Sequence, residues 1–241
     1  MDIKEDKGRI HQVLKHYFGY NSFRAQQEQI INTILDGQDT VVLMPTGGGK
    51  SICYQLPSLV LEGLTLVISP LIALMKDQVE RLNENGIKAA FINSSLPELR
   101  RKEIEHELEE GLIKLLYVSP EKVFASDFLS FLSLLNIRLI AVDEAHCVSS
   151  WGHHFRPEYK KLHFLKKKFP QASMVALTAT ADKAVRSDIG RMLGMQTPRM
   201  FTASFDRPNL SLSVLPGQKK MGANKSIITK VCASKWYYLL Q

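Results

Sequence analysis

The chain has 241 residues, of which 45% are hydrophobic and 23% are charged. This composition is typical of a globular protein and excludes a disordered chain, a collagen and a small disulfide-stapled scaffold. The 31 Lys and Arg residues exceed the 24 Asp and Glu residues, so the formal net charge is +7, which suits a polyanionic partner without identifying one.

Membrane, secretory and disulfide signals are weak. No apolar run approaches the roughly 18 residues of a membrane span, and the first residues lack the apolar core of a secretory signal. The cysteines Cys53, Cys147 and Cys232 are odd in number and far apart, which favours reduced thiols over disulfides or a zinc site. We therefore expect a cytoplasmic protein, in the bacterial cytosol or nucleoid, with no membrane association.

Seven short apolar runs are predicted to be strands. In chain order they cover residues 40–44, 64–68, 89–92, 115–118, 139–142, 174–177 and 200–203. Runs that are apolar on both faces are typical of parallel strands covered by helices on both sides. Helix-length segments alternate with them, and helices are predicted over 71–83 and 97–110, the second with Ser95 as a capping candidate. The pattern predicts an α/β fold with a mostly parallel sheet, spanning residues 1–215, followed by a divergent tail over 216–241.

A glycine-rich segment follows the first predicted strand and precedes a helix, which is the context of a phosphate-binding loop, or P-loop. Its residues are Met44, Pro45, Thr46, Gly47, Gly48, Gly49, Lys50 and Ser51. Glycines let backbone N–H groups turn toward phosphates, and the helix N-terminus adds a favourable dipole. We expect Lys50 to reach the β- and γ-phosphates and the Ser51 hydroxyl to bind Mg²⁺. Met44 departs from the strict motif, which has glycine there, and a chance glycine-rich turn is the alternative.

Two carboxylates, Asp143 and Glu144, follow the strand predicted over 139–142. In a doubly wound sheet ligands gather at the carboxyl ends of strands, so both are expected at the same edge as Lys50. Asp143 is predicted to bind Mg²⁺, and Glu144 to orient or deprotonate an attacking water. Alone, such a pair is often only a capped turn, and the P-loop is what favours the catalytic interpretation.

His146 is a further candidate of this acidic segment, with a weaker case of its own, because lone histidines usually have structural partners. The hydroxyls of Thr178 and Thr180, at the end of another predicted strand, are candidates to hydrogen-bond the acidic segment.

Seven segments form a recognisable set in a fixed order. They are residues 18–24, 44–51, 69–78, 143–147, 151–159, 176–181 and 204–209. Together they resemble the RecQ family of superfamily 2 DNA helicases, over roughly residues 8–215. The resemblance implies a RecA-like P-loop NTPase lobe, the first of two in a motor that hydrolyses ATP with Mg²⁺ and moves 3′ to 5′ to unwind DNA in repair and recombination. The implied partners are single-stranded DNA, duplex junctions and other repair proteins.

The resemblance also implies an adenine-recognition set made of Tyr20, Arg24 and Gln27. Tyr20 would stack on the base, and Gln27 would read its edge through the side-chain amide. Without the resemblance, Tyr20 would be interpreted as a core aromatic residue.

The segment 151–159 resembles the aromatic-rich loop that couples DNA binding to ATP hydrolysis in this family. Trp151 and Phe155 can stack on unpaired bases, and Arg156 can meet a phosphate or a base face. Lys76 and Gln78 resemble residues that contact the backbone of a DNA strand in this family. Read without the family, the two aromatic residues would be assigned to the core and the helix residues to the solvated surface.

The sequence departs from the family at Gln26, where glycine is common, and at His154, where aspartate is usual, and we expect altered coupling from the second. No second RecA-like lobe and no four-cysteine zinc pattern follow residue 216, so we expect a truncated chain or a gene interrupted near Lys220, inactive in unwinding alone. Two alternatives stay open: a non-hydrolysing module that binds nucleotide or single-stranded DNA, and an RNA-directed superfamily 2 helicase, which the aromatic-rich loop opposes.

Overall fold

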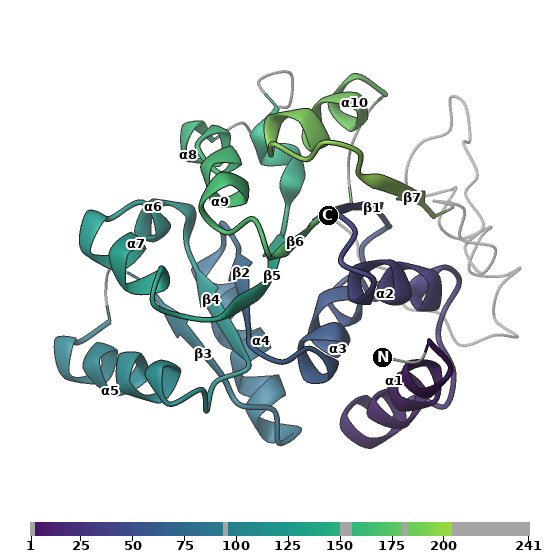
Figure 1. Cartoon of the computed structure of the whole chain (residues 1–241), viewed down its shortest axis with the longest axis horizontal. Coiled ribbons are helices and arrows are strands. Elements are labelled where there is room, and N and C mark those ends of the chain that lie inside the picture. Colours follow the sequence, from purple (N-terminus) through teal and green to yellow (C-terminus); the bar gives the residue numbers. More distant parts are fainter. Residues whose placement is uncertain (1–2, 94–95, 150–155, 180–182, 204–241) are drawn as a thin grey trace, which may run out of the picture. The chain divides into compact units, whose positions relative to one another are not determined.

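A parallel sheet of seven strands organises the chain in the computed structural model, which describes residues 3–93, 96–149, 156–179 and 183–203 (Figure 1). The strands are β1 (Thr40–Leu43), β2 (Leu64–Ile68), β3 (Ala89–Ile92), β4 (Leu115–Val118), β5 (Ile137–Val142), β6 (Ser173–Thr178) and β7 (Arg199–Thr202). Their order is β3-β4-β2-β5-β6-β1-β7, and every pair of neighbours is parallel. All seven predicted strands are confirmed, with ends that shift by at most two residues.

Helices cover both faces of the sheet (Figure 1). They are α1 (Ile3–Phe18), α2 (Gln27–Leu35), α3 (Ile52–Val60), α4 (Ile72–Glu84), α5 (Glu98–Glu109), α6 (Pro120–Val123), α7 (Ser126–Leu132), α8 (Pro157–Lys160), α9 (His163–Lys168) and α10 (Lys183–Met192), with a 3₁₀ turn η1 (Ala145–Val148). The helices predicted over 71–83 and 97–110 are confirmed as α4 and α5. Ser95, the predicted cap of α5, lies outside the described residues.

Two apolar layers account for the double coverage. Along β1, Val41 and Leu43 point into the layer formed with α5, α7, α9 and α10, whereas Val42 points into the layer formed with α2, α3 and α4. Because successive side chains of a strand alternate between faces, a strand buried on both sides must be apolar at each position. This is the origin of the continuous apolar runs in the sequence, and the predicted α/β fold is confirmed.

The parallel strands bring their carboxyl ends to one edge of the sheet. Backbone hydrogen bonds continue the pairing just beyond the strands: the N–H of Asp143 donates to the carbonyl of Ile68 (2.9 Å), and the N–H of Met44 donates to the carbonyl of Thr178 (3.1 Å). The P-loop, which follows β1, and the acidic segment, which follows β5, therefore emerge on the same edge, with only β6 between their strands.

The described residues all belong to one compact unit, Met1–Phe205, so the predicted boundary at residue 215 lies outside them and stays a prediction. Cys53 and Cys147 are buried free thiols, and Cys232 is not among the described residues. Among the helices that are described, none has the length and apolar character needed to cross a membrane.

Candidate nucleotide site

The P-loop connects the end of β1 to the start of α3 in a tight turn. Gly47 and Gly49 adopt φ angles of +80° and +81°, a region that residues with a Cβ rarely enter. The N–H of Gly48 donates to the carbonyl of Pro45 (3.0 Å), and a Cβ added at Gly48 would approach that oxygen to 2.9 Å. The glycines are therefore required by the backbone path, which keeps the loop open to an approaching phosphate chain.

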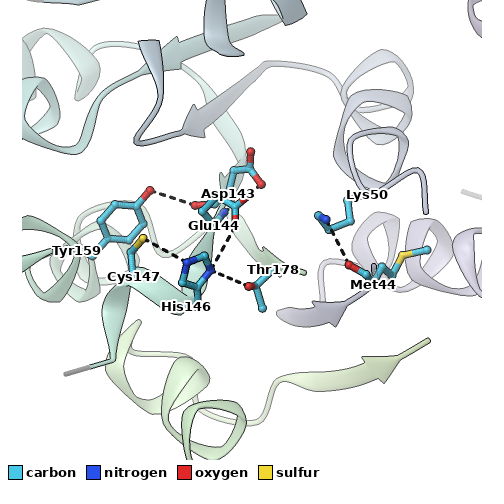
Figure 2. Close-up of polar contacts among 8 residues, drawn as sticks. All are labelled: Met44, Lys50, Asp143, Glu144, His146, Cys147, Tyr159 and Thr178. Carbon is cyan, nitrogen blue, oxygen red and sulfur yellow. Dashed lines mark hydrogen bonds and ion pairs between the residues drawn. The ribbon is translucent and has the colours of Figure 1, made fainter. Parts of the chain in front are cut away.

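The Lys50 side chain folds back over this loop, and its Nζ donates to the Met44 carbonyl at 3.2 Å (Figure 2). Met44 itself is only 2% exposed and packs in the core, so the departure from the strict motif is accommodated by burial. Of the other two departures, Gln26 precedes α2 and has a buried Oε1 with no hydrogen-bond partner among the described residues, and His154 lies outside them.

Asp143 lies directly after β5 and is 8% exposed. Burial, together with the neighbouring Glu144, raises the pKa of the Asp143 carboxyl from its ordinary value of 3.8 to about 6, and the charge of Lys50 opposes that rise. Figure 2 shows the Lys50 amine on the side of its loop that faces the acidic segment. The predicted convergence of the two motifs at one edge agrees with this geometry.

Glu144 and His146 form an ion pair beside Asp143. Glu144 has a φ of +48°, which is uncommon for a residue with a side chain, and its N–H donates to Asp143 Oδ1 (3.0 Å). His146 Nδ1 lies 3.2 Å from Glu144 Oε2 and 2.9 Å from the hydroxyl of Thr178 (Figure 2). Contacts with Cys147 and Glu144 raise the pKa of His146 to about 9, so the imidazole is protonated at neutral pH and orients the Glu144 carboxylate. The expected contact of the Thr178 hydroxyl is present, and Thr180 lies outside the described residues.

Two residues of the predicted adenine set, Arg24 and Gln27, contact the P-loop, and the third, Tyr20, lies beside Arg24. The Arg24 guanidinium lies 5.8 Å from the centre of the Tyr20 ring and donates to the Gly47 carbonyl (3.2 Å). Gln27 is 2% exposed, and its Nε2 donates to the Gly49 carbonyl (3.1 Å) while its Oε1 accepts from the N–H of Arg24 (2.8 Å). Tyr20 is 46% exposed, so its ring is accessible for stacking. Gln27 braces the loop in this structure, in addition to any contact with a base.

The predicted DNA contacts lie in three different settings. Lys76 is on the exposed side of α4, forms an ion pair with Glu80 (3.8 Å) and lines a surface hollow of about 260 Å³. Arg156 donates through Nη1 to the carbonyl of Pro70 (3.3 Å), at the loop that leads into α4. Trp151 and Phe155 lie outside the described residues, so their roles stay predictions.

Gln78 lies in a different setting from Lys76, and its predicted contact with DNA stays a prediction. The sequence predicts that Gln78, like Lys76, contacts the backbone of a DNA strand. In the structure its side-chain amide faces the interior and bonds to Tyr54, Gln55 and Tyr117. The physical reason is helical periodicity: Gln78 lies three residues after Met75 and four before Leu82, both of which are buried. The same periodicity is the signal by which the sequence could have revealed its orientation. Sequence reasoning missed these three partners.

The oxygen atoms at this edge suit a magnesium–nucleotide complex. The Ser51 hydroxyl and the Asp143 carboxylate are hard oxygen donors, which Mg²⁺ prefers, and Mg²⁺ is usually held by one or two such groups together with substrate phosphates. No cluster of three or more His, Cys, Asp or Glu in the described part of the chain could hold a metal ion by itself. The donor set therefore fits a metal that arrives with a phosphate ligand.

Comparisons with known proteins agree with this arrangement. The chain is 53% identical over 209 residues to the ATP-dependent DNA helicase RecQ of Haemophilus influenzae, which covers 87% of this chain and 34% of that protein. It is 52% identical over 209 residues to RecQ of Pasteurella multocida, covering 87% of this chain and 33% of that protein, and 45% identical over 214 residues to RecQ of Bacillus subtilis, covering 88% and 36%. The chain thus spans about a third of the length of these relatives.

A crystal structure of the DUF1998 helicase MrfA bound to DNA and AMPPNP has a similar fold, with a TM-score of 0.65 and 20% sequence identity, and the match covers 81% of this chain and 29% of that one. The α/β fold is consistent with a RecA-like lobe. The family described as DEAD/DEAH box helicase matches residues 24–187, which is more than half of the chain. The chain therefore belongs to the DEAD/DEAH box helicase family, and its sequence relatives include ATP-dependent DNA helicases of the RecQ type.

Proposed function

We propose that residues 1–215 are the ATP-binding lobe of a RecQ-type DNA helicase, which couples ATP hydrolysis to 3′–5′ movement along DNA. The observation that carries the proposal is the parallel strand order, in which the P-loop follows β1 and the acidic segment follows β5, with only β6 between these strands. It brings the phosphate-binding and acidic motifs to one edge of the sheet, where a parallel α/β fold binds ligands. Unwinding would require a second lobe. Because DNA is the proposed partner, we also propose that the protein is located in the cytoplasm.

Each polar group of the site has a distinct task in this proposal. Lys50 leaves the Met44 carbonyl and binds the β- and γ-phosphates of ATP, and the backbone N–H groups of the P-loop enclose them. Ser51 and Asp143 hold Mg²⁺, which when bound neutralises charge on the phosphates. Glu144 orients the attacking water and accepts its proton.

His146 supports Glu144 in this scheme. A protonated imidazole 3.2 Å from the carboxylate keeps one oxygen of Glu144 paired, and the Thr178 hydroxyl holds the ring from the side of β6. Tyr20 and Arg24 receive the base, and Lys76, Trp151, Phe155 and Arg156 are proposed to contact single-stranded DNA.

The test is ATP binding and hydrolysis by the chain, with and without single-stranded DNA. We expect Lys50→Ala to lower ATP affinity at least about tenfold, and Glu144→Gln to lower hydrolysis by at least about 100-fold with binding retained. Glu84→Gln is the matched control for charge loss, because Glu84 is exposed at the end of α4. Failure of the parent chain to bind ATP, or equal binding by Lys50→Ala, would refute the proposal.

The same assay distinguishes the proposed helicase lobe from two alternatives, a non-hydrolysing binding module and an RNA-directed motor. ATP binding that depends on Lys50, without any turnover in the presence of DNA, would identify the isolated chain as a non-hydrolysing nucleotide-binding module. A preference for single-stranded RNA over DNA as the stimulating strand would favour an RNA-directed motor.

A further inference from the structure

A cluster of polar side chains joins α3, β4 and α4, and all of its members except Gln78 are buried. Tyr54 and Gln55 come from α3, Tyr117 comes from β4 and Gln78 comes from α4. Gln78 Oε1 accepts from the Tyr54 hydroxyl (2.8 Å), from Gln55 Nε2 (3.0 Å) and from the Tyr117 hydroxyl (3.1 Å). Three side chains from two elements thus converge on the amide oxygen of Gln78.

The cluster offers three donors to the two lone pairs of the Gln78 oxygen, so these hydrogen bonds are partly shared. Gln55 Nε2 has two hydrogens and also donates to the Tyr117 oxygen (3.0 Å), and the two phenols lie 3.3 Å apart. Burial raises the pKa of both phenols far above the usual value, so both remain protonated donors. Because the oxygen of the Gln78 amide is held by the cluster, its nitrogen has a fixed direction.

That nitrogen points to a residue of the nucleotide site. Gln78 Nε2 donates to the Ser51 hydroxyl oxygen at 3.4 Å. Ser51 is the P-loop residue proposed to hold Mg²⁺, and its own side chain makes no capping bond to the start of α3. The contact from α4 is therefore positioned to set the rotamer of the Ser51 hydroxyl.

We infer that Gln78 is a positioning residue, which holds the Ser51 hydroxyl in the orientation that binds Mg²⁺ and is itself held by Tyr54, Gln55 and Tyr117. This inference rests on the proposed function, since it assigns Ser51 to the metal. An amide N–H bonded to one lone pair of the serine oxygen leaves the other lone pair for the metal, and outer partners of this kind tune metal ligands.

The placement of Gln78 also links the site to the surface of α4. Lys76 lies two residues earlier on the exposed side of the same helix, beside the hollow lined by Ile72, Ala73, Phe91, Asn93 and Leu96. The contact with Ser51 and one wall of this hollow are thus formed by the same helix.

The experiment measures binding of a fluorescent, non-hydrolysable ATP analogue to the chain, in Mg²⁺ and in EDTA. The ratio of the two affinities is the magnesium factor. Gln78→Met keeps the side-chain length but removes both hydrogen-bonding groups, and we expect it to lower the magnesium factor by about tenfold, the lower end for outer partners of metal ligands, because the bond is long. The control is Glu84→Gln on the same helix, which should leave the factor unchanged.

A double variant separates positioning from general support. In a Ser51→Ala background, Gln78→Met should cause no further loss of the magnesium factor, because its effect acts through the serine oxygen. An additional loss in that background, or an equal loss of affinity in Mg²⁺ and in EDTA, would overturn the inference. If Gln78→Met lowers the affinity for single-stranded DNA in the absence of nucleotide and leaves the magnesium factor unchanged, Gln78 contacts DNA as the sequence predicted. That result would also overturn the positioning inference.

Folding is monitored by thermal unfolding of each variant. If Gln78→Met does not fold, Tyr117→Phe is the second variant: it keeps the ring, removes one anchor of the Gln78 amide (3.1 Å) and should lower the magnesium factor in the same direction, and an unchanged factor would refute the inference. If the parent chain shows no magnesium-dependent binding, the proposed function fails and this inference fails with it. An unchanged factor in Gln78→Met, with normal binding by the parent, refutes this inference alone.

Discussion

Replacing Asp143 with asparagine should make the protein more stable at neutral pH. The carboxyl is 8% exposed, and burial together with Glu144 raises its pKa from 3.8 to about 6. A rise of about two pH units corresponds to about 3 kcal/mol of unfavourable charging in the folded state. Asparagine avoids that cost and keeps an oxygen to accept from the N–H of Glu144 (3.0 Å). We expect the free energy of unfolding to rise by up to about 3 kcal/mol at pH 8.

The pH dependence gives this prediction its sign. Because the folded pKa is raised, the folded protein binds more protons than the unfolded chain between about pH 4 and pH 6, so the parent loses stability as the pH rises through that window. The advantage of Asp143→Asn should therefore be absent near pH 4 and complete above pH 7. The measurement is urea unfolding at several pH values in EDTA, with Asp77→Asn, an exposed carboxylate of α4, as the control. A destabilised variant at pH 8, or an advantage that does not change with pH, would refute the reasoning.

Three further outcomes are expected. Gly49→Ala should lower the melting temperature more than Gly111→Ala, because both glycines have positive φ but only at Gly49 would the added Cβ overlap a neighbouring side chain; equal losses would contradict the steric argument. Tyr20→Ala should weaken ATP binding by about 1–3 kcal/mol without changing the affinity for inorganic triphosphate, as measured by calorimetry, and a loss for both ligands would count against base stacking. The pKa of His146 is raised to about 9, so its stabilising charge is present below about pH 6.5 and lost through pH 9. The melting temperature of the parent should accordingly fall between pH 7 and pH 9.5 relative to that of His146→Gln, and parallel curves would show that protonation of His146 does not stabilise the fold.

The strands were predictable because the sheet is buried on both faces. Every residue of β1, β2, β4 and β6 is buried, so each strand is visible as an apolar run bounded by polar residues. The short helices α6 and α7 had no predicted counterpart, since four and seven residues are too few for a helical period to stand out. Their formation depends on packing, through residues such as Val123 and Phe128, more than on local pattern.

The site was predictable where chemistry follows directly from chain position. Lys50 and Asp143 each come just after a strand, and parallel strands share one functional edge, so topology alone brings them together. The contact of Gln78 with Ser51 has no such origin, because it depends on the crossing of two helices on one face of the sheet. Tyr117 is the clearest example. It lies in a wholly buried strand, and the sequence does not indicate that its hydroxyl donates a hydrogen bond to Gln78.

Thr178, the last residue of β6, contacts both halves of the site, the P-loop and the acidic segment, one through its main chain and the other through its side chain. Its main-chain carbonyl receives the Met44 N–H, whereas its hydroxyl meets the imidazole of His146. Thr178→Val would remove the contact with His146 and keep the main-chain hydrogen bond with Met44. The two halves of the site can thus be disconnected at one residue while the pairing of β1 with β6 is retained.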